Sequence, residues 1–319
     1  MNRLFRDFHG GPSCPQGSVA CIGAFDGLHL GHQALLRHAT ARARALGVPM
    51  VALSFEPLPR EFFARPMPPR LLLPRARVLG LCELGADLVG LLRFNAQMAA
   101  MSAETFVHEL LVRRLQVREV WVGPGFRFGS KRGGDLVTLQ RQCRQHGFEA
   151  GEIEPVLLDG ERVSSTRIRA ALRDGDFATA TQLLGRPYAI GGHVVRGAQL
   201  GRNLGFPTAN LRFGGKVPPL SGIFATRVHG VGPQPWPSVS SFGTRPTVQG
   251  SSEPLLEAHL FDFDGDLYGR RIEVEFVARL RDELKFDDLP ALVAQMHLDA
   301  RQARDILQND TVNRTRAYA

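Results

Sequence analysis

Cysteine is scarce in this chain, and its placement argues against both a zinc site and a disulfide framework. The 319 residues include only Cys14, Cys21, Cys82 and Cys143. No two of them form a C-x-x-C pair, so the usual spacing of zinc ligands is absent. Scattered cysteines in a chain of this length indicate reduced and buried thiols, and we therefore expect a cytoplasmic protein.

Long apolar runs are also missing. The most apolar stretch, residues 78–92, is interrupted by Glu83 and Asp87, so it falls short of the roughly 18 to 20 apolar residues of a membrane span. Arg3 and Arg6 interrupt the N-terminal segment, where a secretory leader would have an apolar core. We expect neither a membrane segment nor an export signal.

Tyrosine and tryptophan are rare, with three and two residues against 20 phenylalanines. The net charge of +8 fits a protein that handles polyanions such as nucleotides or nucleic acid. A β-barrel that binds RNA would need a groove of stacking aromatic side chains, whereas the phenylalanines stand mostly at core-like positions. We therefore expect small-molecule ligands and no nucleic-acid partner.

The most informative stretch is residues 19–38, which read VACIGAFDGLHLGHQALLRH. A short apolar strand, 19–22, leads through a glycine-rich turn into a helix. The apolar residues of that helix recur at helical spacing and are Leu35, Leu36, Ala39, Ala43 and Leu46. The first N–H groups of a helix lack partners within it, and the helix dipole adds positive charge there, so such a turn can bind an anion.

Two histidines, His29 and His32, flank Gly31 at this strand-to-helix junction. A single histidine there would usually be a surface or capping residue, but two of them favour a site that stabilises developing phosphate charge. A second helix start of similar character, residues 163–169, has hydroxyl side chains followed by arginines. The candidate phosphate-binding residues of this half are Gly23, Phe25, Asp26, His29, Gly31, His32, Ser164, Ser165, Thr166 and Arg169.

Strands and helices alternate up to Gly185, and the pattern then changes. The length suggests about two domains. For residues 1–185 we predict a Rossmann-like α/β domain, a parallel sheet with flanking helices, whose ligands lie beyond the carboxyl ends of the strands. For residues 186–319 we predict an antiparallel β-barrel followed by a terminal helix.

The predicted elements of the first half are strands 48–54, 87–92, 119–122 and 149–155, helices 75–84, 102–115 and 135–146, and a long loop that reaches Pro74. Those of the second half are strands 188–195, 222–228, 236–242, 256–261 and 272–279. The terminal helix begins near Asp287 and Asp288, with an apolar side made of Leu289, Leu292, Met296 and Leu307.

A second dense stretch, residues 197–210, reads GAQLGRNLGFPTAN. Its glycines would let backbone N–H groups approach a ligand closely, although a glycine-rich hairpin alone would also explain them. Thr208 and Asn210 offer oxygen atoms for Mg²⁺ or phosphate. Further on, alternation places Glu257 opposite Leu256 and Ala258, where a carboxylate could act as a general base.

These motifs together resemble a known enzyme family. The H-x-G-H within GAFDGLHLGH resembles the signature of the nucleotidylyltransferase superfamily. The series G-x-x-x-G-R-x-L-G-F-P-T-A-N, G-T-R-P-T, L-E-x-H-L and D-L-Y-G resembles riboflavin kinase. In this order, from about Val19 to the last helix, the chain resembles the prokaryotic bifunctional riboflavin kinase/FMN adenylyltransferases, also called FAD synthetases.

The resemblance implies two ATP-dependent steps, from riboflavin to FMN and from FMN to FAD, with Mg²⁺ accompanying ATP. In the kinase step, Thr208 and Asn210 would hold Mg²⁺ and the ATP phosphates, and Glu257 would deprotonate the terminal ribityl hydroxyl of riboflavin. The residues that would lie around the kinase nucleotide are Gly192, Gly197, Gly201, Arg202, Pro207 and Asn210. In the adenylyl step, His29 and His32 would stabilise the ATP phosphates, and Ser164, Ser165, Thr166 and Arg169 would support the pyrophosphate.

One position departs from the family pattern. The residue before the F-x-F-G of the first half is usually Asp or Asn in the family, whereas here it is Gly125. Glycine removes a polar side chain from a loop that would face the nucleotide. We therefore expect adenylyl transfer to be weakened relative to kinase activity.

Other functions explain less of the sequence. A different H-x-G-H enzyme, such as a pantetheine- or nicotinamide-nucleotide adenylyltransferase or an aminoacyl-tRNA synthetase, would leave residues 188–279 unexplained. The K-M-S-K-S motif of the synthetases has only a faint counterpart at residues 129–132. A flavin-dependent oxidoreductase would use flavin as a cofactor, whereas here flavin would be substrate and product. The sequence gives no oligomeric state.

Overall fold

The computed structural model describes residues 4–7, 10–197, 200–246 and 252–317. Ala198 and Gln199 of the second glycine-rich stretch, and Thr247 of the G-T-R-P-T motif, lie outside the described residues. The chain forms two compact units. The first contains Met1–Pro68 and Pro74–Ser165, and the second contains Pro69–Leu73 and Thr166–Ala319. The domain boundary expected after Gly185 stays a prediction.

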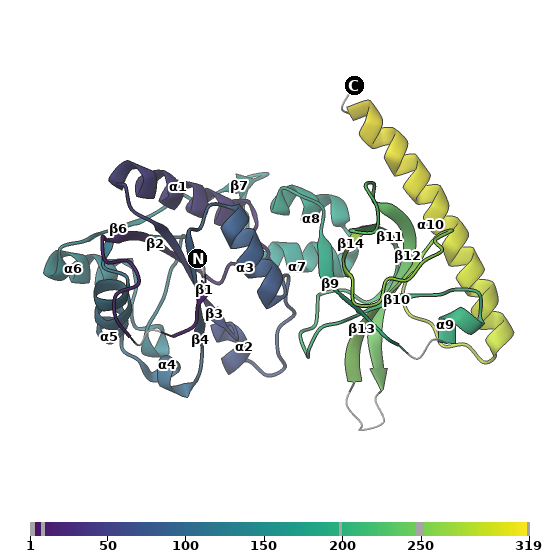
Figure 1. The fold of residues 1–319 in the computed structure, drawn as a ribbon, viewed down its shortest axis with the longest axis horizontal. Coiled ribbons are helices and arrows are strands. Elements are labelled where there is room, and N and C mark those ends of the chain that lie inside the picture. The colour runs from purple at the N-terminus through teal and green to yellow at the C-terminus, as the bar shows by residue number, and fades with distance from the viewer. Residues whose placement is uncertain (1–3, 8–9, 198–199, 247–251, 318–319) are drawn as a thin grey trace. The chain divides into compact units, whose positions relative to one another are not determined.

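The first unit is built on a six-stranded sheet in which all strands are parallel (Figure 1). Its strands are β1 (Leu4–Phe5), β2 (Ser18–Ile22), β3 (Met50–Glu56), β4 (Leu88–Arg93), β5 (Val117–Val122) and β6 (Glu149–Glu152). They lie in the order β1-β4-β3-β2-β5-β6. The chain leaves β2 toward β3 and β4 and later returns to β5 on the other side, so the strand order reverses at β2. Ligands of such sheets bind at this switch point, beyond the carboxyl ends of the strands.

Helices follow the strands as the alternating pattern predicted. They are α1 (Leu30–Leu46), α2 (Pro59–Phe63), α3 (Pro74–Glu83), α4 (Ala96–Ala100), α5 (Ala103–Phe106), which continues as a wider helical segment η1 (Val107–Arg114), the short turn η2 (Ser130–Arg132) and α6 (Leu136–His146). Ser102 and Asp135 cap α5 and α6 through their side chains, and Gly147 ends α6 with a φ of 74°. These caps satisfy backbone groups at the helix ends.

The second unit contains a closed barrel of six antiparallel strands. They are β9 (Ala189–Val195), β10 (Ala209–Arg212), β11 (Gly222–His229), β12 (Trp236–Pro246), β13 (Ser252–Leu260) and β14 (Arg271–Arg281), and they close in the order β10-β13-β12-β11-β14-β9. Alternation along β13 and β14 buries Leu256 and Ala258, and likewise Ile272 and Val274. The predicted parallel sheet, barrel and terminal helix are thus confirmed.

Helices complete the second unit. They are α7 (Ser165–Asp174), α8 (Phe177–Leu184), α9 (Leu200–Asn203) and α10 (Leu289–Ala317). The first residue of α7, Ser165, belongs to the first unit. Helix α10 lies along β11, β12 and β14 (Figure 1), where Ala303 and Leu307 pack on Ala225 and Val239. No helix in the described part of the chain combines the length and the apolarity needed to cross a membrane.

Three local predictions were wrong. The proline-rich loop before Pro74 contains the helix α2, because Pro59 occupies the first helical turn, where a missing N–H costs nothing. Strand β10 was missed, because the stretch that contains it was interpreted as a ligand loop or a glycine-rich hairpin to which no strand was assigned. Leu289 is 56% exposed in the first turn of α10 and is not part of its buried side. A two-stranded ribbon, β7 (Leu157–Leu158) with β8 (Glu161–Arg162), was not expected either.

Candidate active sites

The H-x-G-H turn brings its two histidines into contact. His29 is the N-cap of α1, and its Nδ1 accepts a hydrogen bond from the backbone N–H of His32 at 3.3 Å. The two rings stack with centroids 3.6 Å apart. A Cβ at Gly31 would lie 3.2 Å from the His29 ring, so a side chain there would require the ring to shift by a few tenths of an ångström. The structure thus places the two candidate histidines side by side at the start of α1, and their role at a phosphate stays a prediction.

His32 is held as a neutral imidazole. Burial lowers its pKa well below the usual value, and the neighbouring His29 and then Arg162 lower it further. Its Nδ1 is buried and has no hydrogen-bond partner among the described residues. A neutral imidazole has one donor nitrogen and one acceptor nitrogen. The unpaired Nδ1 can therefore form a hydrogen bond with a bound phosphate or with water.

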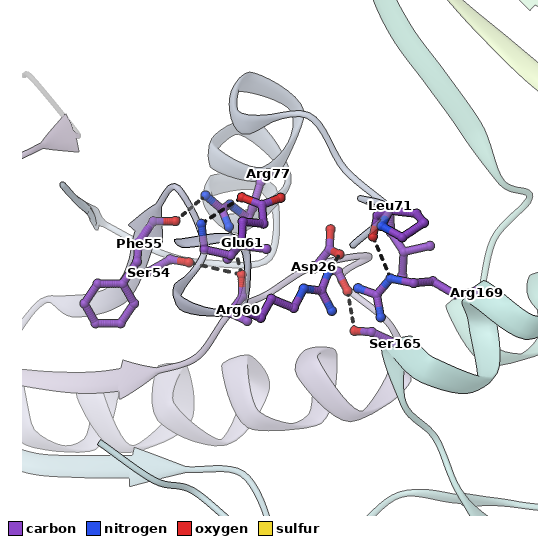
Figure 2. Close-up of polar contacts among 12 residues, drawn as sticks. Asp26, Ser54, Phe55, Arg60, Glu61, Leu71, Arg77, Ser165 and Arg169 are labelled. Atoms are coloured by element: carbon purple, nitrogen blue, oxygen red, sulfur yellow. Dashed lines mark hydrogen bonds and ion pairs between the residues drawn. The ribbon is translucent and has the colours of Figure 1, made fainter. Parts of the chain in front are cut away.

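The turn before the histidines is fixed by charged and hydroxyl groups from other elements (Figure 2). Asp26 is 1% exposed and forms an ion pair with Arg60 of α2. The backbone carbonyl of Asp26 accepts a hydrogen bond of 2.7 Å from the Ser165 hydroxyl. A buried carboxylate is stable only when it is paired, so the ion pair with Arg60 holds Asp26 in place inside the turn.

Arg77 of α3 also contacts this turn, and no motif or spacing in the sequence analysis pointed to it. Its guanidinium is fully buried and donates to the carbonyl oxygens of Ala24 at 3.0 Å and Phe55 at 2.8 Å, and to the Glu56 carboxylate at 2.9 Å. The Ser54 hydroxyl also donates to the Ala24 carbonyl, at 3.1 Å. The backbone at Ala24, just before the phosphate-binding turn, is therefore anchored to the end of β3 (Figure 2).

Phenylalanine rings gather where β3 and β4 end. Phe55 lies near the end of β3, Phe94 follows β4, and Phe62 and Phe63 belong to α2. The centroid of the Phe94 ring lies 5.4 Å from that of Phe62 and 5.9 Å from that of Phe63. Phe63 is 66% exposed. This aromatic surface is at the carboxyl-end edge of the sheet, the same edge as the H-x-G-H turn.

The other predicted residues of the first half divide between the units. Ser164 and Ser165 belong to the first unit, whereas Thr166 and Arg169 belong to the second. Arg169 is buried and its Nε donates to the Pro69 carbonyl at 2.8 Å. The joint role of these four residues at a pyrophosphate stays a prediction.

Gly125 occupies a turn that follows β5. Its φ of +72° is in the left-handed region, and its N–H donates to the Glu152 carboxylate at 3.1 Å. A Cβ built there would meet only Arg162 Nη1, at 3.9 Å. Aspartate and asparagine tolerate this conformation better than most residues, so the backbone and the surrounding space can accept the side chain that the family usually has.

Two cavities lie side by side on the outside of the barrel. The larger, about 880 Å³, is lined by residues of β13, β14, α10 and the preceding loop, including Glu257, His259, Leu292 and Met296. The smaller, about 410 Å³, is lined by Arg202, Pro207, Thr208, Asn210 and a loop around Asp264 and Tyr268. Thr208 lines both cavities. The segment Pro207–Asn210 therefore separates the two spaces.

The strand register brings Asn210 to Glu257. These residues are directly opposite each other on β10 and β13, so their side chains lie on the same face of the sheet. The Asn210 amide Nδ2 donates to the Thr208 carbonyl at 3.1 Å. Of the predicted kinase residues, the structure thus groups Thr208, Asn210 and Glu257.

Two glycines of this site allow close approach. A Cβ at Gly201 would lie 2.4 Å from the Phe206 carbonyl oxygen, and one at Gly197 would lie 2.8 Å from the Asn210 amide. The first clash involves rigid backbone, so a side chain at position 201 would open the turn. Gly192, on β9, faces Leu211, with a Cβ contact of 3.3 Å.

The residues present fit a Mg²⁺ ion. Asn210 Oδ1 is buried and lacks a hydrogen-bond partner within the described residues, which leaves an oxygen lone pair for a cation. Mg²⁺ prefers oxygen ligands and usually keeps several waters and substrate phosphates rather than filling its shell with protein groups. Consistent with that habit, the described residues contain no cluster of three or more His, Cys, Asp or Glu side chains arranged to hold a metal.

The sequence analysis also missed residues of the larger cavity. Arg281 of β14 forms a bidentate ion pair with Asp299 of α10, at 2.9 Å and 2.6 Å, and both residues line the cavity. This pair joins the terminal helix to the barrel. His259 was quoted within L-E-x-H-L but was given no role; burial lowers its pKa, so its ring is neutral near pH 7.

The fold and the sites together define an enzyme class. One unit presents an H-x-G-H turn at the switch point of a parallel sheet, and the other presents a glycine-rich phosphate segment on an antiparallel barrel. This combination is that of a two-site enzyme with a nucleotidylyltransferase half and a kinase half.

Comparison with known proteins identifies the family. Residues 11–167 match the family model described as FAD synthetase, and residues 184–307 match that described as riboflavin kinase. Three relatives carry the name bifunctional riboflavin kinase/FMN adenylyltransferase. This chain is 42% identical to the relative from Escherichia coli K12, and the match covers 95% of this chain and 97% of the relative. The identity is 44% to that from Pseudomonas fluorescens (95% and 97% covered) and 40% to that from Haemophilus influenzae (95% and 98% covered). The chain belongs to the family of bifunctional riboflavin kinase/FMN adenylyltransferases.

A solved structure has the same two-unit fold. The crystal structure described as a macrolide-efflux protein from Streptococcus pneumoniae is 31% identical, with a TM-score of 0.77, and the match covers 94% of this chain and 98% of that one. The word efflux in that description refers to the pneumococcal protein.

Proposed function

We propose that this chain makes FAD from riboflavin in two ATP-dependent steps, one in each unit. The observation that carries the kinase half is the position of Thr208, which lines both cavities beside Glu257. A nucleotide in the 410 Å³ cavity and a flavin in the 880 Å³ cavity would meet at this residue. The larger space has apolar walls from α10, including Leu292 and Met296, which suit a flavin ring.

In the kinase step, Glu257 accepts the proton of the terminal ribityl hydroxyl of riboflavin, and the oxygen of that hydroxyl bonds to the γ-phosphorus of ATP. The bond from that phosphorus to the bridging oxygen breaks, and ADP leaves. Thr208 and Asn210 hold the phosphates and the Mg²⁺ ion, which when bound neutralises phosphate charge. The chemistry requires no covalent intermediate, so positioning and charge stabilisation supply most of the rate.

In the adenylyl step, a phosphate oxygen of FMN bonds to the α-phosphorus of a second ATP, and pyrophosphate leaves. His29 and His32 face the phosphates at the start of α1, with Gly23, Phe25, Asp26 and Gly31 shaping the turn. Ser164, Ser165, Thr166 and Arg169 support the pyrophosphate. The phenylalanines at the ends of β3 and β4 offer a surface on which the flavin ring can pack.

We further infer that the enzyme works in the cytoplasm on small-molecule substrates and has no nucleic-acid partner. The cysteines support the first inference, since none of the four, all of which lie in the described part of the chain, forms a disulfide. The scarcity of tyrosine and tryptophan supports the second.

Product analysis tests the proposal directly. Purified protein is incubated with riboflavin, ATP and Mg²⁺, and the flavins are separated by chromatography over time. FMN followed by FAD is the expected result. FMN without FAD would place a defect in the first unit, and an absence of riboflavin conversion would refute the kinase assignment, with FMN then supplied directly to test adenylyl transfer.

A further inference from the structure

His259 stands at the boundary between the two cavities of the barrel. It follows Glu257 by two residues on β13, so both side chains lie on the outer face of that strand. His259 lines the larger cavity, whereas Pro207 lines the smaller one. A contact between these two residues therefore links the wall of the larger cavity to the segment that separates the two cavities.

Such a contact exists. The imidazole Nδ1 of His259 lies 2.9 Å from the backbone carbonyl oxygen of Pro207. A carbonyl oxygen can only accept, so Nδ1 carries the proton and donates. The pKa of the ring is lowered by burial, which is consistent with a neutral side chain having one fixed donor.

The ring is also held by packing. Its centroid lies 4.9 Å from that of Phe206, a residue that is itself 5% exposed. Phe206 in turn contacts His297 of α10, with centroids 4.9 Å apart. The imidazole is therefore fixed between β13, the Pro207 segment and the terminal helix.

This hydrogen bond completes the restraint of Thr208. The Pro207 carbonyl and the Thr208 nitrogen belong to one planar peptide, so holding the carbonyl fixes the peptide that precedes Thr208. The peptide that follows is held by Asn210, whose Nδ2 donates to the Thr208 carbonyl. Both peptides around Thr208 are thus anchored by side chains from the outer face of the barrel.

We propose that His259 is a positioning residue for riboflavin phosphorylation, which holds Thr208 between the ATP phosphates and the ribityl hydroxyl through its bond to Pro207. This role rests on the function proposed above for Thr208 and Glu257. His259 does not touch the reacting atoms; it acts by restricting the segment that does. A purely structural role of the ring would predict lost stability without a specific loss of phosphate transfer.

The test uses two substitutions of similar size in the full-length protein. In His259→Asn the side-chain amide nitrogen takes the place of Nδ1 and can still donate to Pro207. His259→Leu has nearly the same shape as asparagine but no donor. His193→Leu is a matched control, because it removes another imidazole bond to a backbone carbonyl, that of Gly269 at 3.2 Å, from strand β9 of the same barrel.

Kinase rates are measured as the sum of FMN and FAD formed from riboflavin, with riboflavin and MgATP varied separately. MgADP affinity is measured by calorimetry without turnover, adenylyl transfer is measured with FMN supplied, and thermal unfolding is followed for every variant. Loss of a residue that orients the groups around a metal typically costs about 10- to 100-fold. We expect His259→Leu to lower the kinase kcat and the MgADP affinity by about this factor, with adenylyl transfer unchanged.

Under the proposal, His259→Asn and the His193 control stay within about threefold of the parent. A His259→Leu kinase within threefold of the parent overturns it. So does an asparagine variant as impaired as the leucine variant, since ring packing and not the donor would then matter. Glu257→Gln distinguishes a failure of the proposed kinase site from a failure of the role proposed for His259. If it leaves kinase activity intact, the proposed site is wrong; if it abolishes activity while His259→Leu does not, only the role of His259 fails.

Discussion

Arg77 links the turn before His29 and His32 to the end of β3. Replacing Arg77 by methionine removes that link while keeping most of the length of the side chain. Methionine leaves the carbonyls of Ala24 and Phe55 without this donor and the Glu56 carboxylate without its cation. Breaking a buried ion pair costs about 3–5 kcal/mol. The lower end applies here, about 3 kcal/mol, because Glu56 is 21% exposed and Ala24 keeps its bond from Ser54.

The expected changes are in stability and in one activity only. For a unit of this size, each kcal/mol shifts the unfolding midpoint by about 2–4 °C, so the first unit should unfold about 6–12 °C earlier. The turn that holds His29 and His32 loses an anchor, and a displacement of about 1 Å at such a site can cost about 100-fold in rate. We expect adenylyl transfer from ATP to FMN to fall at least tenfold, with riboflavin phosphorylation within twofold of the parent.

The assay compares both activities in the same preparation at a temperature well below the first transition. Arg75→Met is the matched control, because Arg75 lies on the same helix with an exposed side chain. The reasoning is refuted if Arg77→Met unfolds earlier but transfers adenylyl groups at the parental rate, because the arginine would then only stabilise the unit. Equal loss of both activities would refute it too, since the damage would not be local.

Three further changes test other parts of the two sites. Gly125→Asp adds a Cβ whose contact within 4 Å is Arg162 Nη1, and we expect FAD formation from FMN to rise; if it does not, the missing side chain is not limiting. The lowered pKa of His32 means that unfolding takes up a proton there, so the stability that its neutral state contributes is full above about pH 6.5 and is lost as the pH falls. Denaturant titrations from pH 8 to 5 should show this loss, and His32→Asn should reduce it. Gly201→Ala forces a Cβ onto a backbone carbonyl, a strain of about 1–3 kcal/mol, and should raise the KM for ATP in the kinase reaction; Gly232→Ala, which has open space, should not.

The sequence predicted most of the fold because its periodicities are local. The helical spacing of Leu35 and Ala39 and the alternation of Ile272 and Val274 reflect which side of an element is buried, and the structure buries all four. Strand β10 was missed because its four residues are too short to display a period. Leu289 was misplaced because helical spacing continues into the first turn of α10, where no other element covers it.

The candidate sites divide in the same way. His29 and His32 contact each other because they are three residues apart at a helix start, and Thr208 with Asn210 are neighbours along the chain. Arg77 and His259 contact residues that are more than 50 positions away. Their role depends on how strands and helices pack, which no spacing in a single sequence reveals.

The two sites also share a principle of construction. In each unit the segment proposed to face phosphate is continuous in sequence and includes a carbonyl held by a side chain: that of Ala24 in one unit and that of Pro207 in the other. Each carbonyl accepts a hydrogen bond from a side chain of a distant element, Arg77 or His259. Flexible glycine-rich segments can approach a ligand closely but lose conformational entropy when they are ordered. A side-chain donor that holds such a segment reduces its conformational freedom before the substrate binds. The motif therefore determines which groups contact the substrate, and the distant side chain determines where those groups lie.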